Sequence, residues 1–414
     1  MNESERCEAL LRELFAQDQF AIKLGAEAMA EAARLEGLGR CARVTVHIAG
    51  TNGKGTTSAA LTALCHAAGL KTGLYTSPHL VSFRERIRVG TLPISERALA
   101  ALLDPLLTRF AGRRCAAEGM RPLTYFELAT LAAWRHFADS QLDVAIIETG
   151  LGGRLDATNT IPKDLTAITN IALDHEAFLG TSVEAIAAEK YGITRAGLPL
   201  FLHEAAQGVG AVAACAAADD RPVEWVAGGA TARDQNLALA AALFVCVAER
   251  LQLSPDAVQR AKSVGLAALR WPGRQQWLEE GGRALLVDGA HNRNGVEACA
   301  AWLAAIGEGG SAPRTAIVGL TADRDPAAIL APLRPFVSRW IAVAADNPKA
   351  MPAADLATRL AEFGPVEVAA GGIEDALHRS RPDDTLIVGS LYLVGDLFAA
   401  LGFTAESLRI YDAS

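Results

Sequence analysis

The sequence predicts an α/β protein with two domains: an N-terminal domain on a P-loop-type, doubly wound parallel sheet, and a smaller Rossmann-like α/β domain after it. Short apolar segments alternate with helical ones in both halves, as in sheets whose parallel strands are joined by helices. A glycine-rich loop follows the first apolar segment. At 414 residues the chain is also too long for one typical core. We expect a first domain over residues 1–278, a hinge at 279–283 and a second domain over 284–414.

The first half contains a series of apolar strands that end in polar or glycine residues. Gly69 is a helix C-cap signal, and Thr124 with Glu127 forms a capping box at a helix start. Thr181, with Glu184 three residues later, is expected to cap a further helix that ends near Lys190. Two short helices are expected within residues 4–36. The predicted strands are 44–48, 71–76, 142–148, 166–172 and 198–202, and the predicted helices are 57–68, 95–110, 124–137, 181–190 and 232–251.

A second α/β series begins after the turn-like segment Glu279-Glu-Gly-Gly282. Its first strand ends in the polar cluster Asp288-Gly-Ala-His-Asn292. The predicted strands of this half are 284–288, 315–319, 340–344 and 385–389, with helices between them. No convincing repeat relates the two halves.

The bulk composition argues against several classes of protein. A net charge of −8 and a pI near 5.6 disfavour a nucleic-acid binder, which usually carries a basic face. The seven cysteines are scattered without a Cys-x-x-Cys pair, as expected for reduced cytosolic thiols. The N-terminus has no apolar signal core, and the longest apolar run, 237–248, is too short to span a bilayer. We therefore expect a soluble, cytoplasmic protein with no membrane partner.

The loop Gly50-Thr-Asn-Gly-Lys-Gly-Thr56 has the layout that binds phosphates: a strand, glycines and a helix N-terminus. Glycines let backbone N–H groups approach phosphate oxygens. Lys54 would place a positive charge on the β- and γ-phosphates, and Thr56 a hydroxyl on Mg²⁺. The spacing differs from the common P-loop, because Ile48 lies six positions before the lysine and Gly55 separates Lys54 from Thr56. The alternative is an ordinary glycine turn.

Further polar residues follow other predicted strands, and the carboxyl ends of parallel strands share one edge of a sheet. Ser77, Glu148 and His175 are therefore expected to converge on the loop. A buried carboxylate such as Glu148 needs a cation, a proton or a hydrogen-bond network, for which Arg154 is a candidate. His175 is either a structural histidine or a metal ligand, which is unusual for Mg²⁺.

Other candidates have plain structural interpretations too. Lys190 at a helix C-terminus suits the helix dipole, or it carries CO₂ as a carbamate that bridges metal ions. Glu127 is better explained as a helix cap than as a catalyst. Phe126 is either a core residue or faces a flat ligand.

These segments together resemble the dihydrofolate synthase/folylpolyglutamate synthase family, within the larger group of Mur-type ATP-dependent ligases. The similarity runs from about residue 10 to the C-terminus. The phosphate loop is shared with the wider group, whereas the Gly-Leu-Gly-Gly-Arg-Leu-Asp-Ala-Thr-Asn block is more specific for the folate branch. The motifs are Gly50–Thr56, Ser77-Pro-His-Leu80, Glu148–Asn159, Ala172-Leu-Asp-His175, Glu189-Lys190 and Asp288–Asn292.

The resemblance implies an acid–amine ligase: ATP phosphorylates a carboxylate, and the amino group of L-glutamate displaces phosphate from the acyl phosphate. It implies a catalytic role for Lys54, His175 and Lys190, and a pterin or folate site in the first domain. The implied ATP-binding residues are Gly50, Thr51, Asn52, Gly53, Lys54, Gly55, Thr56, Asn236, Arg274, Asp288 and His291. The implied ligands of two Mg²⁺ ions are Thr56, Ser77, Glu148, His175 and carbamylated Lys190, and Phe126 and Asp156 lie near the pterin.

The implied activity is bifunctional: dihydropteroate and glutamate give dihydrofolate, and further glutamate is added to reduced folates. The alternatives are a single-activity member, another Mur-type ligase acting on a peptidoglycan precursor, and a nucleotide sensor without ligase chemistry. A nucleic-acid motor is disfavoured by the acidic balance. No feature of the sequence requires an oligomer, so we expect a monomer. One departure bears on the substrate: relatives read Leu-Gly-Leu-Glu-Arg where this chain has Leu24-Gly-Ala-Glu-Ala.

Overall fold

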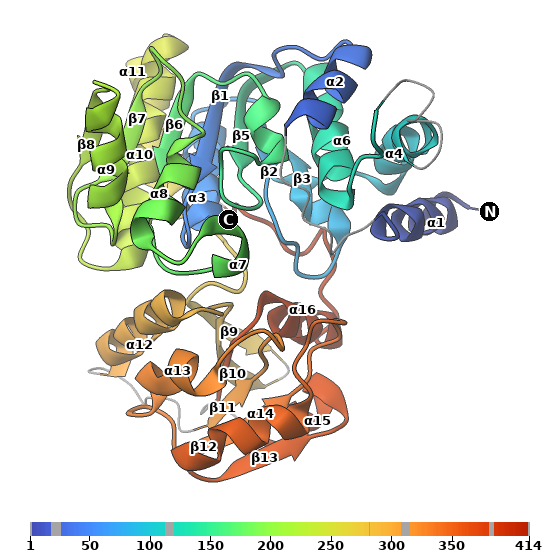
Figure 1. Ribbon diagram of the computed structural model, residues 1–414, viewed down its shortest axis with the longest axis vertical. Coiled ribbons are helices and arrows are strands. Elements are labelled where there is room, and N and C mark those ends of the chain that lie inside the picture. The colour runs from blue at the N-terminus through green and yellow to red at the C-terminus, as the bar shows by residue number, and fades with distance from the viewer. Residues whose placement is uncertain are drawn as a thin grey trace. The chain divides into compact units, whose positions relative to one another are not determined.

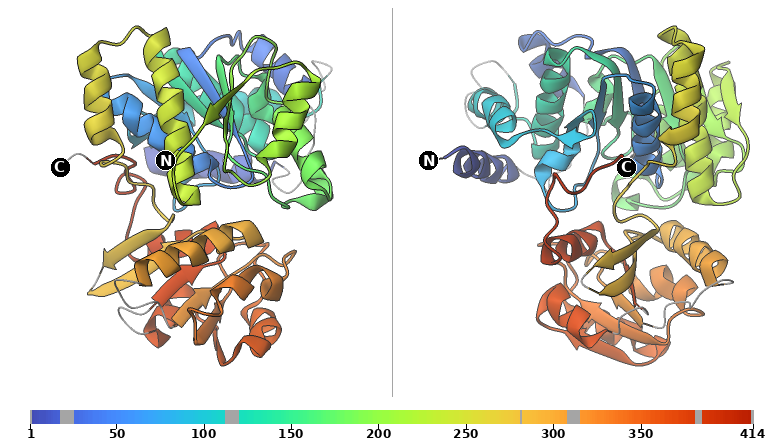
Figure 2. Two further views of the ribbon diagram at one scale, coloured as in Figure 1. Left: turned by 90° about the vertical axis from the view of Figure 1, so that its left-hand side faces the viewer. Right: turned by 180° about the vertical axis from the view of Figure 1, so that it is seen from behind.

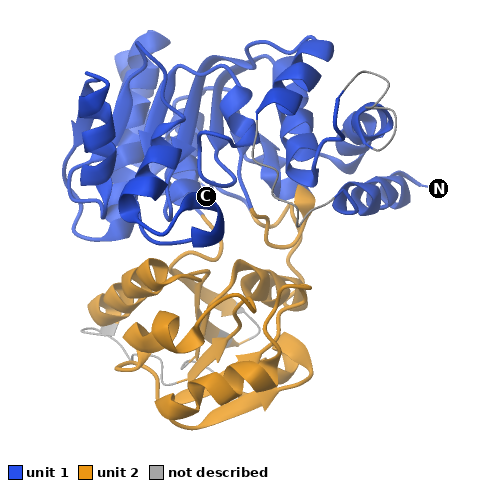
Figure 3. Cartoon of the chain, viewed as in Figure 1, with its two compact units in different colours: residues 1–77, 84–270, 409–414 blue, residues 78–83, 271–408 orange. Residues whose placement is uncertain are grey.

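The computed structural model describes residues 2–17, 26–111, 120–280, 282–307, 315–380 and 385–412, so Leu24 and Gly25 lie outside the described residues. The chain forms two compact units, coloured blue and orange in Figure 3. Unit 1 comprises Met1–Ser77, Arg84–Arg270 and Arg409–Ser414, and unit 2 comprises Pro78–Phe83 and Trp271–Leu408.

The division between the units falls earlier than the expected boundary at 278. It lies between Arg270 and Trp271. The predicted hinge at 279–283 overlaps two paired strands of unit 2, because Glu279 pairs with Ala284 and Glu280 with Arg283 in an antiparallel ladder. The Glu-Glu-Gly-Gly signal therefore marks a hairpin turn and not a connection between units.

Unit 1 is built on an eight-stranded sheet in the order β4-β3-β2-β5-β1-β6-β7-β8 (Figure 1). Six neighbouring strands, β2, β5, β1, β6, β7 and β8, are parallel. At one end of the sheet, β3 pairs antiparallel with β2 and with β4. After β1 the chain adds β2 and β5 on one side of β1 in the sheet, and it later adds β6 on the other side. This reversal beside β1 is where ligands bind in doubly wound sheets. The strands are β1 (Ala42–Ala49), β2 (Thr72–Tyr75), β3 (Ile87–Val89), β4 (Leu92–Pro93), β5 (Leu142–Glu148), β6 (Leu165–Ile168), β7 (Leu200–His203) and β8 (Val223–Val226).

Helices cover both faces of this sheet. Helices α3 and α10 pack together on one face, and α8 and α9 pack together on the other (Figure 2). The Thr124–Glu127 capping box at the start of α6 is confirmed, and Arg121 pairs with Glu127, which supports a structural role for this acid. The helices of unit 1 are α1 (Glu3–Phe15), α2 (Glu27–Leu35), α3 (Lys54–Ala67), α4 (Glu96–Phe110), α6 (Tyr125–Asp139), α7 (Glu176–Leu179), α8 (Val183–Tyr191), α9 (Val209–Ala218), α10 (Ala232–Arg250) and α11 (Pro255–Arg260).

Unit 2 contains a six-stranded sheet in the order β13-β12-β11-β14-β10-β9, parallel except for β9. Leu286 belongs to one hydrophobic core and its neighbours Leu285 and Val287 to another, so β10 is buried on both faces, as parallel strands usually are. Its elements are β9 (Gln276–Glu280), β10 (Arg283–Asp288), α12 (Arg293–Gly307), β11 (Thr315–Val318), α13 (Pro326–Leu330), β12 (Arg339–Val343), α14 (Ala353–Leu360), β13 (Val366–Ala369), α15 (Gly372–Arg379), β14 (Thr385–Val388) and α16 (Leu391–Ala400).

The α/β class and its two sheets are as predicted, but two details differ. The cap of α8 is Ser182, whose hydroxyl accepts from the N–H of Ala185, and not Thr181. The missed strands are β3, β4, β8, β9 and β13, and all except β3, which lies between β4 and β2, are at sheet edges. Edge strands are partly exposed and mix polar with apolar residues, as Val-Glu-Trp-Val in β8 does, so their pattern is weak. Among the described helices, none is both long and apolar enough to cross a membrane.

Candidate active site

The phosphate loop joins β1 to α3 and depends on glycine at two points. Gly53 is the N-cap of α3 with φ +85°, and Gly50 has φ +151°. A Cβ on Gly50 would lie 1.8 Å from Oγ1 of Thr169, and one on Gly53 would lie 2.4 Å from Oδ1 of Asn236. Both the backbone conformation and the lack of space therefore require glycine, and Asn236 is brought against the loop as predicted.

Protein contacts fix the shape of this loop. The N–H of Thr51 donates to the Asn170 carbonyl (2.9 Å), and the N–H of Asn52 donates to the Asn170 side chain (2.8 Å). Nζ of Lys54 donates to the carbonyls of Gly50 and Thr51, both at 3.0 Å. Asn170, which the sequence did not single out, thus anchors the loop to the chain that follows β6.

Glu148 lies beside the loop because β5 pairs with β1 in parallel, with Glu148 opposite Ile48. It is buried, and its Oε2 accepts from the backbone N–H of Ser77 at 3.2 Å, so these two predicted metal ligands meet. Arg154, the alternative partner for this acid, pairs instead with Glu189 at 2.7 Å. Thr56 lies in the first turn of α3.

Lys190 reaches the same loop from the last turn of α8. Its side chain is buried, and Nζ donates to the carbonyl of Gly50 at 2.9 Å, an acceptor that it shares with Lys54. Burial, followed by the positive charge of Lys54, lowers the pKa of Lys190 to about 7. The neutral form of an amine is the one that reacts with CO₂, and both the carbamate and the helix-dipole interpretation stay predictions.

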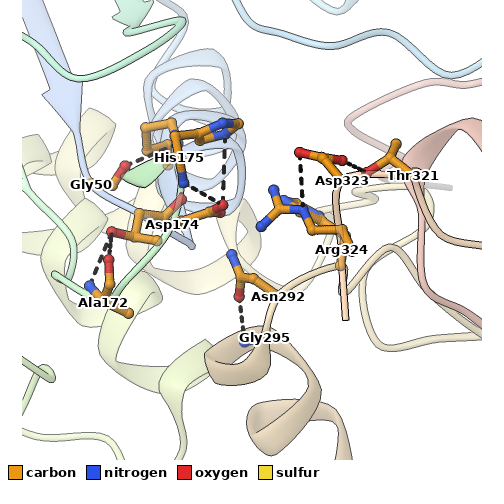
Figure 4. Close-up of polar contacts among 12 residues, drawn as sticks. Gly50, Ala172, Asp174, His175, Asn292, Gly295, Thr321, Asp323 and Arg324 are labelled. Carbon is orange, nitrogen blue, oxygen red and sulfur yellow. Dashed lines mark hydrogen bonds and ion pairs between the residues drawn. The ribbon is translucent and has the colours of Figure 1, made fainter. Parts of the chain in front are cut away.

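His175 follows β6 at the start of α7 with φ +51°, a left-handed conformation that is uncommon outside glycine. Its backbone N–H donates to Oδ1 of Asp174 at 2.9 Å, and its Nε2 lies 3.9 Å from the same oxygen (Figure 4). The His175 side chain is 44% exposed, while that of Asp174 is buried. The buried acid therefore orients a histidine that remains accessible to a ligand.

These groups suit a hard divalent cation that takes its remaining ligands from water and from substrate phosphates. Among the described residues, no group of three or more His, Cys, Asp and Glu side chains is placed to hold a metal ion. Mg²⁺ is usually held by one or two carboxylates together with hydroxyls, waters and substrate phosphates. A buried carboxylate beside a phosphate loop, with the Ser77 and Thr56 hydroxyls at neighbouring strand and helix ends, matches this pattern.

The two predicted substrate residues lie on either side of one loop. Phe126 packs on the loop after β5, since a Cβ on Gly150 would lie 2.3 Å from its ring. Asp156 closes that loop: its Oδ2 accepts from the N–H of Leu151 (2.8 Å) and its Oδ1 from the N–H of Thr158 (3.0 Å). Burial raises the pKa of Asp156, and these hydrogen bonds oppose the rise.

Three further predicted residues lie in unit 2. Asp288 ends β10 and is buried, with its carboxylate accepting from the N–H groups of Gln275 (3.1 Å) and Ala290 (2.7 Å). Nδ1 of His291 lies 2.9 Å from the Gly289 carbonyl. Arg274 lies against Gly289 as well, since a Cβ there would lie 2.5 Å from its guanidinium. The end of β10 therefore brings Arg274, Asp288 and His291 together.

Comparison with known proteins agrees with this arrangement. Residues 273–390 match the family described as Mur ligase, glutamate ligase domain. The dihydrofolate synthase/folylpolyglutamate synthase of Escherichia coli K12 is 33% identical over 407 residues, 92% of each chain. The structure of E. coli FolC in complex with DHPP and ADP has a TM-score of 0.80 at 29% identity, covering 97% of this chain and 98% of that one. The Yersinia pestis bifunctional folylpolyglutamate synthase/dihydrofolate synthase, complexed with AMPPNP and a Mn ion, has a TM-score of 0.79 at 30% identity, covering 97% and 100%.

A phosphate loop on a doubly wound sheet, followed by a glutamate ligase domain, defines a Mur-type ATP-dependent ligase. Within that class, the chain belongs to the dihydrofolate synthase/folylpolyglutamate synthase family, which confirms the resemblance found in its motifs. It is accordingly an ADP-forming acid–amino-acid ligase that uses ATP.

Proposed function

We propose that this enzyme joins L-glutamate to dihydropteroate and to reduced folates. The γ-phosphoryl group of ATP passes to a carboxylate oxygen of the acceptor, leaving ADP. The glutamate nitrogen then forms a bond to the acyl carbon, the bond from that carbon to the phosphate oxygen breaks, and the amine releases its proton. The observation that carries the proposal is the Gly50 carbonyl, where the phosphate-loop lysine Lys54 and the buried Lys190 meet beside Glu148.

The loop residues and Lys54 bind and orient the phosphates. Phosphoryl transfer needs alignment and positive charge more than covalent help from the protein. Backbone N–H groups at the start of α3 and the Lys54 ammonium supply that charge, and Asn236 holds the loop from the side. Arg274, Asp288 and His291, which come together at the end of β10, remain predicted ATP-binding residues in this proposal.

Thr56, Ser77 and Glu148 would hold one Mg²⁺, and His175 with carbamylated Lys190 a second. The ions supply charge neutralisation on the transferring phosphoryl oxygens. Asp174 keeps His175 in position through the contact with its backbone N–H. Phe126 and Asp156 would bind the pterin end of the acceptor.

A two-acceptor assay tests this function. Purified enzyme is incubated with ATP, Mg²⁺ and L-glutamate, and ADP release is measured with dihydropteroate or with tetrahydrofolate. ADP formation with both acceptors is the expected result. Release with only one acceptor indicates a single-activity member, and release with neither rejects the folate assignment in favour of another Mur-type ligase.

Replacing His175 tests the proposed second metal site. Because His175 is exposed at the start of a short helix, the change to Ala should leave folding and ATP-analogue binding intact while turnover is lost. Normal ADP formation by His175→Ala would instead favour a site without the second metal ion. The described cysteines are all unpaired, and we propose a cytoplasmic monomer.

A further inference from the structure

A chain of buried polar side chains runs from β1 to Asp156. His47 of β1 is 1% exposed, and its Nε2 lies 2.8 Å from Oγ1 of Thr158, which in turn lies 2.5 Å from Oδ1 of Asp156. On the other side of the ring, Nδ1 of His47 lies 3.0 Å from Nζ of Lys163. A histidine, a lysine and an aspartate are thus joined through one hydroxyl beneath the loop that carries Asp156.

The hydrogen-bonding capacity of each group fixes the direction of this chain. Nζ of Lys163 has two further acceptors, the backbone carbonyl (3.1 Å) and side-chain oxygen (2.6 Å) of Asn159. Burial lowers the pKa of Lys163 to about 7, and below that pH its ammonium uses all three of its protons in these contacts. Nδ1 of His47 is then an acceptor and Nε2 carries the proton, consistent with the lowering of the His47 pKa by burial and by Lys163. Since Thr158 accepts from His47, its one hydroxyl proton goes to Asp156.

Asn159 ties the same chain to the helix that carries Lys190. Its side-chain nitrogen donates to the carbonyls of Arg154 (2.9 Å) and Gly192 (3.1 Å), and its oxygen accepts from Lys163 and from Arg195 (3.0 Å). All four hydrogen-bonding positions of the amide are used, which leaves one orientation for it. The Asp156 loop and the end of α8 are therefore held by one fully satisfied network.

We propose that Thr158, His47 and Lys163 are positioning residues that keep the Asp156 carboxylate ionised and correctly aimed, and so set the affinity of the enzyme for the pterin end of its acceptor. Nε2–H of His47 donates to Thr158, and both the hydroxyl and the N–H of Thr158 donate to one carboxylate oxygen of Asp156, which stabilises its charged form. Folding alone does not call for such a chain, because apolar residues of similar volume usually stabilise a core as well as buried charges do. The inference rests on the proposed function, in which Asp156 contacts the acceptor.

The test compares Thr158→Val with Thr158→Ser. Valine keeps the volume but removes the hydroxyl, so the KM for dihydropteroate should rise about tenfold, as expected for one hydrogen bond to a buried charge. The KM values for ATP and glutamate should stay within about twofold of the wild-type values, because the chain does not reach the phosphate loop. Serine restores the hydroxyl and should restore the KM for dihydropteroate. The matched control is Thr62→Val, a buried threonine whose hydroxyl donates to Ser58 within α3.

Two comparisons separate this inference from the proposed function. If Asp156→Asn raises the KM for dihydropteroate but Thr158→Val does not, the positioning role is rejected and the proposed site stands. If Asp156→Asn leaves that KM unchanged, the assignment of Asp156 in the proposed site is rejected together with the inference. Equal rises of all three KM values in Thr158→Val would show a structural role only.

A measurement on the unaltered enzyme covers the case in which Thr158→Val does not fold. Nitrogen-15 NMR of histidine-labelled protein, with the His47 signal assigned by its loss in His47→Gln, reports which ring nitrogen carries the proton. We expect the neutral form protonated at Nε2. A His47 protonated at Nδ1 would reverse the chain and overturn the inference.

Discussion

Replacing Gly53 by alanine should separate the backbone requirement of the phosphate loop from its steric requirement. With φ +85°, Gly53 has a conformation that L-residues rarely adopt. The amide atoms of Asn236 lie only 2.4–2.7 Å from the point where a Cβ on Gly53 would be. Alanine therefore introduces strain and also displaces Asn236. The first effect acts on stability and the second on nucleotide binding.

The two magnitudes follow from these contacts. A left-handed L-residue costs about 1–2 kcal/mol relative to glycine. Asn236 would have to move away from the loop. In the proposed site this removes one neutral hydrogen bond to the nucleotide, worth about 1 kcal/mol, in addition to any shift of the loop itself. We therefore expect the Kd for an ATP analogue to rise about fivefold to tenfold or more.

Gly69 provides a matched control, because it has φ +86° and nothing lies within 4 Å of a Cβ placed on it. Denaturant unfolding should show a similar loss of stability in Gly53→Ala and Gly69→Ala. Calorimetric titration with AMPPNP should show weaker binding in Gly53→Ala alone. An unchanged Kd in Gly53→Ala would mean that Asn236 moves freely and does not contribute to nucleotide binding.

Two further predictions concern the buried lysines. Because the pKa of Lys190 is lowered to about 7, its neutral amine should take up CO₂, so ADP formation should fall in CO₂-depleted buffer and recover with bicarbonate; Lys190→Met should show no such dependence. Burial also lowers the pKa of Lys163 to about 7. Between about pH 7 and 10 the unfolded chain therefore binds a proton that the folded chain lacks. The free energy of unfolding should then rise with pH by up to about 1.4 kcal/mol per pH unit from this group. Lys163→Met should lose that part of the slope in denaturant unfolding measured across the same range, and an unchanged slope would show that Lys163 remains charged when folded.

The central strands were predictable because each is buried on both faces and so forms a continuous apolar segment. Val44–Ile48 and Leu142–Glu148 are of this kind, and both lie in the middle of the unit 1 sheet. The edge strands β8 and β13 were missed because half of their residues face solvent and give a mixed pattern. The unit boundary was misplaced for a related reason, since a glycine-rich turn looks the same in a hairpin as in a connection between units.

The convergence of several candidate residues was also predictable, because parallel strands end at a common edge. Ser77 and Glu148 are far apart in sequence, yet both follow strands beside β1 and meet through a hydrogen bond. The network of His47 and Lys163 was not predictable in the same way. His47 lies within an apolar strand and Lys163 in a loop, and their contact depends on which face of β1 the following chain covers.

The shared contact at Gly50 explains how two lysines in one site can take opposite roles. Two ammonium groups that donate to one carbonyl repel each other, and the repulsion is stronger where water is excluded. Burial is the largest cause of the fall in the pKa of Lys190 to about 7, and the positive charge of Lys54 adds to it. Lys54, held on the half-buried loop, is left to supply the positive charge that phosphates require. Removal of the charge in Lys54→Met should therefore raise the pKa of Lys190 and, if Lys190 forms the proposed carbamate, reduce the uptake of CO₂ at neutral pH.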